Sequence, residues 1–124
     1  MSNQRVLFVE DNIISAMETC EVLRDSGYNV LEVHRAADAQ DVIDSHVPLS
    51  ALVTDVDLGP GADGFQVAQA ARRVHPHLPV VYISGAEGAR HPAEGVTGSQ
   101  FVAKPFYPRQ VIEALDRAIR REAA

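Results

Sequence analysis

Five polar side chains stand at the ends of short apolar runs, and together they could carry phosphoryl-transfer chemistry: Glu10, Asp11, Asp55, Ser84 and Lys104. Three carboxylates placed together repel one another, and one ammonium does not balance them. A divalent cation would, and hard oxygen ligands of this kind suit Mg²⁺, which usually takes one or two carboxylates and keeps several waters. A carboxylate can also attack a phosphoryl group and form an aspartyl-phosphate.

Each of these residues has a functional interpretation and a simpler structural one. Asp55 is the strongest candidate for a phosphoacceptor, because an ordinary acid at the end of a buried strand would lack a partner. Glu10 and Asp11 could hold the metal, or could be acids that stabilise a helix dipole. Lys104 could stabilise charge on the transferring oxygens, or be a surface lysine. Ser84 could donate to a phosphate oxygen, or be a turn residue.

The chain around these residues alternates between strand and helix. Short, nearly continuous apolar runs predict strands over Arg5–Val9, Asn29–Val33, Leu49–Thr54, Val80–Ser84 and Gln100–Ala103. Apolar residues at three- and four-residue steps predict helices over Ala36–His46, Phe65–His75 and Pro108–Arg121, after a first helix with Ile13, Ala16, Met17, Cys20 and Leu23 on one face.

Strands that alternate with helices imply a parallel α/β sheet covered on both faces. In such a sheet the functional groups gather beyond the C-terminal ends of the strands, so we expect the polar side chains to meet at one edge. The stretch between Ser84 and Gln100 should hold a crossover helix. It is rich in glycine and contains Pro92, so at most one or two helical turns are expected there.

Composition fits a single soluble domain of 124 residues with 46% hydrophobic and 23% charged residues. The net charge of −6 argues against direct binding to nucleic acid or to an anionic membrane. The lone Cys20 excludes an internal disulfide. The chain has no apolar run long enough to span a bilayer and no signal-peptide pattern, so the expected location is the cytoplasm.

The motifs Glu10-Asp11, Asp55, Ser84-Gly85 and Lys104-Pro105-Phe106 together resemble the receiver domains of two-component response regulators. The resemblance covers essentially the whole chain. It implies a flavodoxin-like, doubly wound five-stranded parallel sheet in the order 2-1-3-4-5, here with a weak or irregular fourth helix. We expect one receiver domain over residues 1–124, as a natural single-domain protein rather than a piece of a hybrid kinase.

The resemblance also implies roles for single residues at the metal and phosphoacceptor site. Asp55 would be the phosphoacceptor and would contact the metal. Glu10 and Asp11 would be the acidic metal-binding pair, and the backbone carbonyl of Asp57 would be a further ligand. The implied cofactor is Mg²⁺.

A second group of roles concerns the response to phosphorylation. Ser84 would be the switch hydroxyl and Phe101 the switch aromatic. Lys104 would bind the phosphate, and the peptide bond between Lys104 and Pro105 would be cis.

The implied function is a phosphorelay receiver that accepts a phosphoryl group on Asp55 from a phosphohistidine and switches protein–protein contacts. The donor would be a histidine kinase or a histidine phosphotransfer protein, and the output a downstream protein target. The chain would catalyse at most its own phosphorylation and autodephosphorylation. The oligomeric state stays open.

Three departures from the family pattern bear on these expectations. The loop from residue 56 to 64 is one residue longer than the commonest form. Asp57 adds an acid that would increase repulsion if it faces the site. The segment from Ala86 to Gly98 has few apolar groups, so we expect it to be mobile until phosphorylation or a partner orders it.

Two other functions are compatible with parts of the pattern. In a haloacid-dehalogenase-like phosphatase, Asp55-Val56-Asp57 would supply the nucleophile and the acid, with Ser84 and Lys104 beside them. Such enzymes normally place this motif after their first strand and carry a cap insertion. The other alternative is an adaptor that binds partners without phosphorylation, although it would not need clustered charges that are costly to bury.

Overall fold

The computed structural model describes residues 4–85 and 91–123. Its strands are β1 Arg5–Val9, β2 Asn29–Val33, β3 Ala51–Asp55, β4 Val80–Ser84 and β5 Gln100–Ala103. Its helices are α1 Ile13–Asp25, α2 Ala36–Asp44, α3 Gly64–Val74, α4 His91–Glu94 and α5 Pro108–Ala123. The strands are all parallel and lie in the order β2-β1-β3-β4-β5. The predicted α/β fold class and strand order are confirmed.

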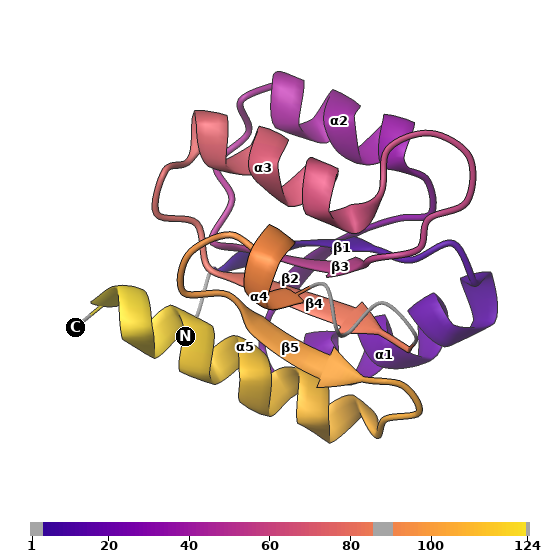
Figure 1. Cartoon of the computed structure of the whole chain (residues 1–124). Helices are drawn as coiled ribbons and strands as arrows, with labels where there is room; N and C mark the ends of the chain where they lie inside the picture. Colours follow the sequence, from indigo (N-terminus) through magenta and orange to yellow (C-terminus); the bar gives the residue numbers. More distant parts are fainter. Residues whose placement is uncertain (1–3, 86–90, 124) are drawn as a thin grey trace.

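Helices cover both faces of the sheet, α2 and α3 on one side and α1 and α5 on the other (Figure 1). Alternate residues of β1 serve the two layers, because successive side chains of a strand point to opposite faces. Val6 and Phe8 pack in the cluster that contains α1 and α5, whereas Leu7 and Val9 pack in the cluster that contains α2 and α3. Every residue of β3 and β4 is buried, as expected for central strands covered on both sides.

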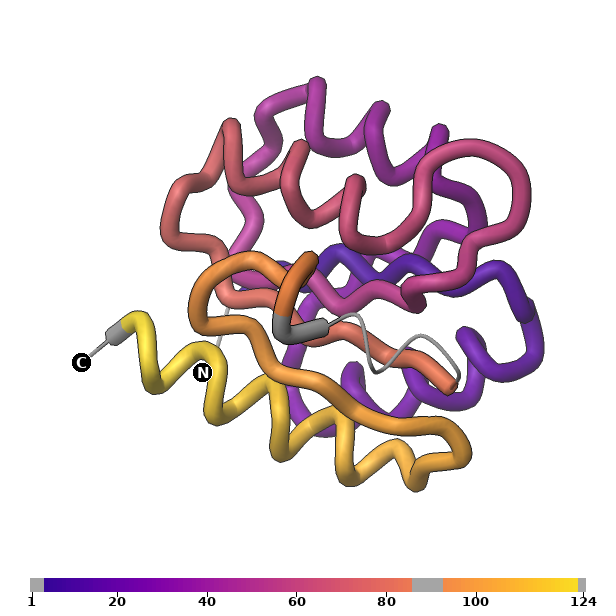
Figure 2. The backbone as a smooth tube through the Cα atoms, in the orientation of Figure 1, coloured from indigo at the N-terminus to yellow at the C-terminus, as the bar shows by residue number. Residues whose placement is uncertain are grey.

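The turns that follow β1, β3 and β5 lie at the same end of the molecule (Figure 2). This is the geometry that parallel strands impose, since all their carboxyl ends point one way. The polar residues that end these strands are therefore brought to one edge, as the sequence predicted.

The predicted inner face of α1 was partly wrong. Ile13 and Met17 are 55% and 58% exposed, whereas the buried side chains of α1 are Ala16, Thr19, Cys20 and Leu23. The buried residues form one stripe at steps of three and four. Ile13 and Met17, four residues apart, share the neighbouring stripe, which faces solvent.

Some element boundaries also differ from those predicted. Helix α2 ends at Asp44 rather than His46, because Ser45 is its C-cap and His46 has a φ of 58°. Helix α3 begins at Gly64 rather than Phe65, and Asp63 and Gln66 form a capping box there.

The connection between β4 and β5 contains only the four-residue α4, so the weak fourth helix is confirmed. Of the segment expected to be mobile, residues 86–90 lie outside the described residues. Among the helices that the structure describes, none combines the length and apolar character needed to cross a bilayer.

Candidate phosphoacceptor and metal site

Glu10 is held in a fixed position at the end of β1. Its side chain is 1% exposed, and its backbone N–H donates to the carbonyl of Val33 at 3.2 Å. The Oε2 atom accepts a hydrogen bond from the backbone N–H of Asn12 at 3.1 Å. Asn12 in turn caps α1, because its side-chain oxygen accepts from the N–H of Ser15 at 3.0 Å. The neighbouring Asp11 is exposed.

Asp55 ends β3 and is 2% exposed. Its Oδ1 accepts a hydrogen bond from the backbone N–H of Asp57 at 3.3 Å. The first residue of α3 is pressed against this strand end, since the N–H of Gly64 donates to the carbonyl of Val56 at 2.8 Å. A Cβ at Gly64 would lie 2.2 Å from the carbonyl oxygen of Asp55. Only glycine fits this close approach of two backbones.

Lys104 reaches both buried carboxylates from the end of β5. Its Nζ lies 2.8 Å from Oδ2 of Asp55 and 3.5 Å from Oε1 of Glu10. The backbone N–H of Lys104 donates to the carbonyl of Ser84 at 2.9 Å, and Ser84 itself is 2% exposed. The bond between Lys104 and Pro105 is cis, as expected from the resemblance.

The acidic cluster has the donor atoms and the unbalanced charge that a divalent cation requires. Carboxylate oxygens of Glu10, Asp11 and Asp55 all lie within 4.8 Å of one another. Burial, followed by the hydrogen bond with Asp55, raises the pKa of Glu10 to about 8. Within the described residues, the buried Oε1 of Glu10 has no hydrogen-bond partner. An all-oxygen site with an unsatisfied carboxylate atom fits Mg²⁺.

Lys104 alone does not neutralise this cluster. Burial lowers the pKa of its ammonium, but the hydrogen bond and charge of Asp55 outweigh that effect, and the pKa is raised overall. The ammonium is therefore fully charged at neutral pH and supplies one positive charge to a cluster of three carboxyl groups, of which Glu10 holds its proton more firmly than usual.

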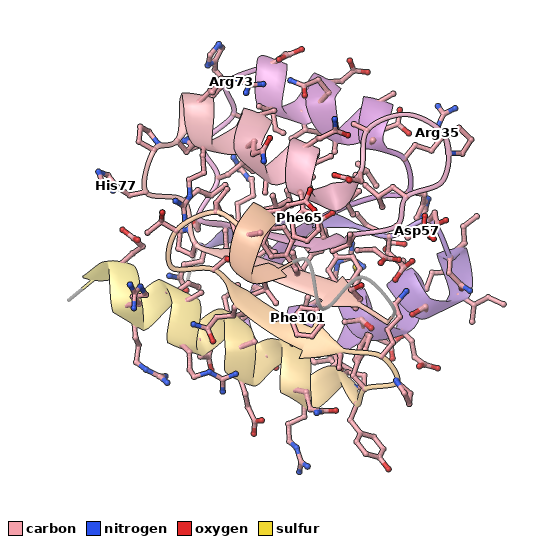
Figure 3. The ribbon with its side chains drawn as sticks, viewed as in Figure 1. Arg35, Asp57, Phe65, Arg73, His77 and Phe101 are labelled. Atoms are coloured by element: carbon pink, nitrogen blue, oxygen red, sulfur yellow. The ribbon has the colours of Figure 1, made fainter. Side chains whose placement is uncertain are left out.

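The side chain of Asp57 is turned toward its own loop. It is exposed, and its Oδ1 accepts a hydrogen bond from the backbone N–H of Gly59 at 3.3 Å. Figure 3 shows Asp57 at the end of the molecule where the strands terminate, whereas His77 lies at the opposite end. The Asp57 side chain thus lies near the site, but it is hydrogen-bonded to the backbone of its own loop.

Phe101 lies on β5 and is half-buried (Figure 3). It packs against the cluster that contains Tyr82 and Phe65. Its predicted role as a switch aromatic, like the metal-binding role of the Asp57 carbonyl, stays a prediction.

The sequence interpretation missed two residues that position this site, Asn12 and Gly64. Asn12 directly precedes a helical pattern, which is the usual signature of an N-cap, so it could have been found. The close approach at Gly64 depends on tertiary packing. Its only sequence signal is the pair Asp63 and Gln66, three residues apart, which indicates a helix start.

It also missed an exposed apolar patch beside the site. The α1 patch, as we call it, consists of Ile13, Ile14 and Met17 in the first turns of α1. These side chains are between 55% and 77% exposed.

Comparison with known proteins agrees with this fold. The family model of the response regulator receiver domain matches residues 6–116. The chain therefore belongs to the response regulator receiver domain family, whose members are phosphoacceptor switches of two-component signalling.

Individual relatives show how far the similarity extends. The virulence transcriptional regulatory protein PhoP of Salmonella typhimurium is 31% identical over 122 residues, covering 96% of this chain and 53% of that protein. The uncharacterized transcriptional regulatory protein YbdJ of Bacillus subtilis is 28% identical over 113 residues, covering 90% of this chain and 49% of that protein. The chain thus spans about half the length of these curated relatives.

Solved structures match over nearly their whole length. A response regulator receiver protein from Sinorhizobium medicae has a TM-score of 0.93 at 30% identity, with 98% of each chain covered. The receiver domain of the hybrid histidine kinase CckA has a TM-score of 0.78 at 28% identity, with 93% of this chain and 98% of that chain covered.

Proposed function

We propose that this chain accepts a phosphoryl group on Asp55 and that the modified carboxylate switches its contacts with other proteins. The observation that carries the proposal is the geometry around Asp55. This buried carboxylate lies 2.8 Å from the Lys104 ammonium and within 4.8 Å of carboxylate oxygens of Glu10 and Asp11. A structural ion pair would need one acid, and a bound cation would relieve the repulsion that the second and third acids add.

In the proposed step, a carboxylate oxygen of Asp55 forms a bond to phosphorus as the bond from phosphorus to a donor histidine nitrogen breaks. The released imidazole takes a proton from solvent. Lys104 lies where its ammonium can hold an oxygen of the transferred group. Ser84, buried two residues from Tyr82 at the end of β4, supplies a hydroxyl that can donate to another phosphate oxygen.

Glu10, Asp11 and Asp55 would hold Mg²⁺, with the backbone carbonyl of Asp57 as a further proposed ligand. When bound, this ion would neutralise charge on the transferring oxygens. The chain's own contribution is to keep Glu10 fixed through Asn12, so that its unsatisfied oxygen points into the cluster.

The proposed donor is a histidine kinase or a histidine phosphotransfer protein, and the α1 patch supports such a partner. Large apolar side chains gathered on a surface commonly mark a protein contact. The α1 patch begins two residues after Asp11, whose carboxylate lies within 4.8 Å of that of Asp55, so a protein bound there would lie close to the acidic cluster. The downstream target would be a protein too.

Family membership argues against the phosphatase alternative, and the cluster of buried charges argues against an adaptor that needs no phosphorylation. We propose that residues 1–124 act as one receiver domain, that their catalysis is limited to self-phosphorylation and autodephosphorylation, and that they act in the cytoplasm.

The test is incubation with the small phosphodonor phosphoramidate and Mg²⁺, followed by intact mass spectrometry. We expect the mass of one phosphoryl group on the wild type and none on Asp55→Asn. The adduct should require Mg²⁺, and it should not form when EDTA is added before the phosphodonor. An adduct that persists in Asp55→Asn would contradict the proposal, and steady release of phosphate from simple phosphomonoesters would favour the phosphatase.

A further inference from the structure

Tyr82 connects the centre of the sheet to the segment that follows α4. Its side chain is fully buried, and its hydroxyl oxygen accepts a hydrogen bond from the backbone N–H of Val96 at 3.1 Å. Its ring packs on Phe65 with 4.9 Å between ring centroids. Its neighbour across the sheet on β5 is Phe101. A buried phenol that caps a backbone N–H in a distant loop fixes the distance between the two segments.

Arg72 makes a second connection to the same segment. Its Nε donates to the carbonyl of Leu78 at 2.8 Å, and its Nη2 donates to the carbonyl of Thr97 at 2.7 Å. One planar guanidinium thus joins α3, the turn before β4 and the turn before β5. We call the bond from Val96 to Tyr82 and the bond from Arg72 to Thr97 together the β4 latch.

The end of β4 is also bonded to the site on both sides. The carbonyl of Ile83 accepts from the N–H of Val56 at 3.0 Å, and the carbonyl of Ser84 accepts from the N–H of Lys104 at 2.9 Å. Lys104 in turn pairs with Asp55. Ile83 and Ser84 directly follow Tyr82 in β4, so a shift at the site reaches the β4 latch along two residues of the strand.

We propose that the β4 latch holds the unphosphorylated arrangement of the α4–β5 connection, and that a phosphoryl group on Asp55 acts against it. This inference rests on the proposed function. A phosphoryl group adds about −1.5 to −2 charge, which attracts the Lys104 ammonium and the Ser84 hydroxyl. Ser84 ends β4 and Lys104 is hydrogen-bonded to it, whereas Val96 and Thr97 are held by the β4 latch. Tyr82 and Arg72 are therefore positioning residues for the response of this surface.

The first test compares Tyr82→Phe with wild type, using beryllofluoride with Mg²⁺ as a mimic of the phosphoryl group. The substitution removes one hydroxyl and keeps the ring. Since the hydrogen bond from Val96 to Tyr82 opposes the bound state, its loss should tighten beryllofluoride binding roughly fivefold. Tyr28→Phe is the matched control, because it likewise removes one hydroxyl that takes part in a hydrogen bond; the Tyr28 hydroxyl donates to Asp116 of α5, on the other face of the sheet. Its affinity should stay within about twofold of wild type.

Because coupling between two sites is reciprocal, beryllofluoride binding should weaken the β4 latch in the wild type. Amide hydrogen exchange at Val96 should become faster when beryllofluoride binds, and in Tyr82→Phe it should already be fast without the ligand. Unchanged or weaker binding in Tyr82→Phe, or equal tightening in Tyr28→Phe, would overturn the inference. Absence of beryllofluoride binding to the wild type would overturn the proposed function, and the latch with it.

Arg72→Lys tests the other half of the β4 latch. Lysine keeps the charge but cannot donate to two carbonyls in the fixed geometry of a guanidinium. We expect beryllofluoride to bind this variant more tightly as well, by at least about twofold. Arg73→Lys is its control, because Arg73 is the next residue of α3 and projects into solvent (Figure 3). Equal effects of the two substitutions would exclude a specific role for Arg72.

Discussion

At the scale of single residues, backbone contacts set the site as firmly as its charges do. Asp55 ends β3, and its position depends on the helix α3 that packs against this strand end. The first turn of α3 approaches so closely that a hydrogen atom is all that fits at Gly64. The acidic residues and the glycine thus form one unit, although only the acids could do chemistry.

Substitution of Gly64 by alanine tests this dependence. The new Cβ would meet backbone atoms of Asp55 and Val56 at 2.2 and 2.8 Å, and backbone cannot move aside as a flexible side chain does. We expect a loss of about 2–4 kcal/mol in the free energy of unfolding, with slower phosphorylation by phosphoramidate in the protein that remains folded. Urea unfolding measures the first effect.

Gly85→Ala is the matched control for this change. Within the part of the chain that the structure describes, a Cβ at Gly85 has nothing within 4 Å, and the substitution should alter the free energy of unfolding by less than about 1 kcal/mol. If both variants unfold at the same urea concentration as wild type, the close approach at Gly64 has no energetic importance.

At the scale of elements, α1 has two separate functions. Its buried stripe of small residues packs on the sheet and α5, and its outer stripe presents the apolar side chains of the α1 patch. This arrangement leaves large apolar residues in solvent on a helix close to the site. Covering by a partner would bury them.

Ile14→Ser and Met17→Ser test the α1 patch. Both side chains are exposed, so we expect folding to be nearly unchanged, with effects within about 0.5 kcal/mol. Phosphotransfer from a phosphorylated histidine phosphotransfer protein should slow by about tenfold or more, since a buried apolar anchor typically contributes over 1 kcal/mol to binding. Phosphorylation by phosphoramidate should stay at the wild-type rate.

Substitutions elsewhere on the surface provide the comparison for these variants. Gln69→Ser alters an exposed position of α3, and it should leave both reactions unchanged. An equal slowing of the protein donor and the small donor would mean that the α1 substitutions disturb Asp55 itself rather than docking.

The sequence predicted elements best where burial is uniform. The apolar runs of β1, β3 and β4 can lie only in the interior, so their existence and pairing direction follow from composition and periodicity. The face of α1 could not be predicted as well, because two adjacent stripes are apolar and only packing decides which is buried. The capping box at Asp63 was a readable signal for the start of α3.

The candidate site was predictable for a related reason. A parallel sheet brings all its strand ends to one edge, so residue types at those ends suffice to propose Glu10, Asp55 and Lys104 as neighbours. Nothing in the sequence indicates that Tyr82 caps Val96 or that Arg72 bridges two turns. Those contacts join residues whose proximity is a result of the finished fold.

At the scale of the whole molecule, the proposed Mg²⁺ would link stability to the acidic cluster. A buried carboxylate without its metal is costly, and an uncharged replacement should be better tolerated. Mg²⁺ that binds only the folded state should stabilise it by about 1.4 kcal/mol for each tenfold rise in concentration above the dissociation constant.

Glu10→Gln measures this link. In EDTA we expect the variant to unfold at higher urea than wild type, by about 1–2 kcal/mol in free energy. On addition of Mg²⁺ the wild type should gain stability, and Glu10→Gln should gain much less. Glu113→Gln, which removes an exposed acid of α5, should respond to Mg²⁺ as wild type does. A full Mg²⁺ response in Glu10→Gln would exclude Glu10 as a ligand.

The packing of α1 against α5 has a consequence for how the chain folds as it is synthesised. Tyr28, in the turn that follows α1, donates a hydrogen bond to Asp116 of α5, and the two residues are 88 positions apart. The layer made by α2 and α3 draws on residues that emerge early, but the apolar stripe of α1 stays uncovered until the residues from Pro108 onward leave the ribosome. Contacts of such long range form late and slow folding, so the nascent chain passes through a stage with one face of its sheet open to chaperones.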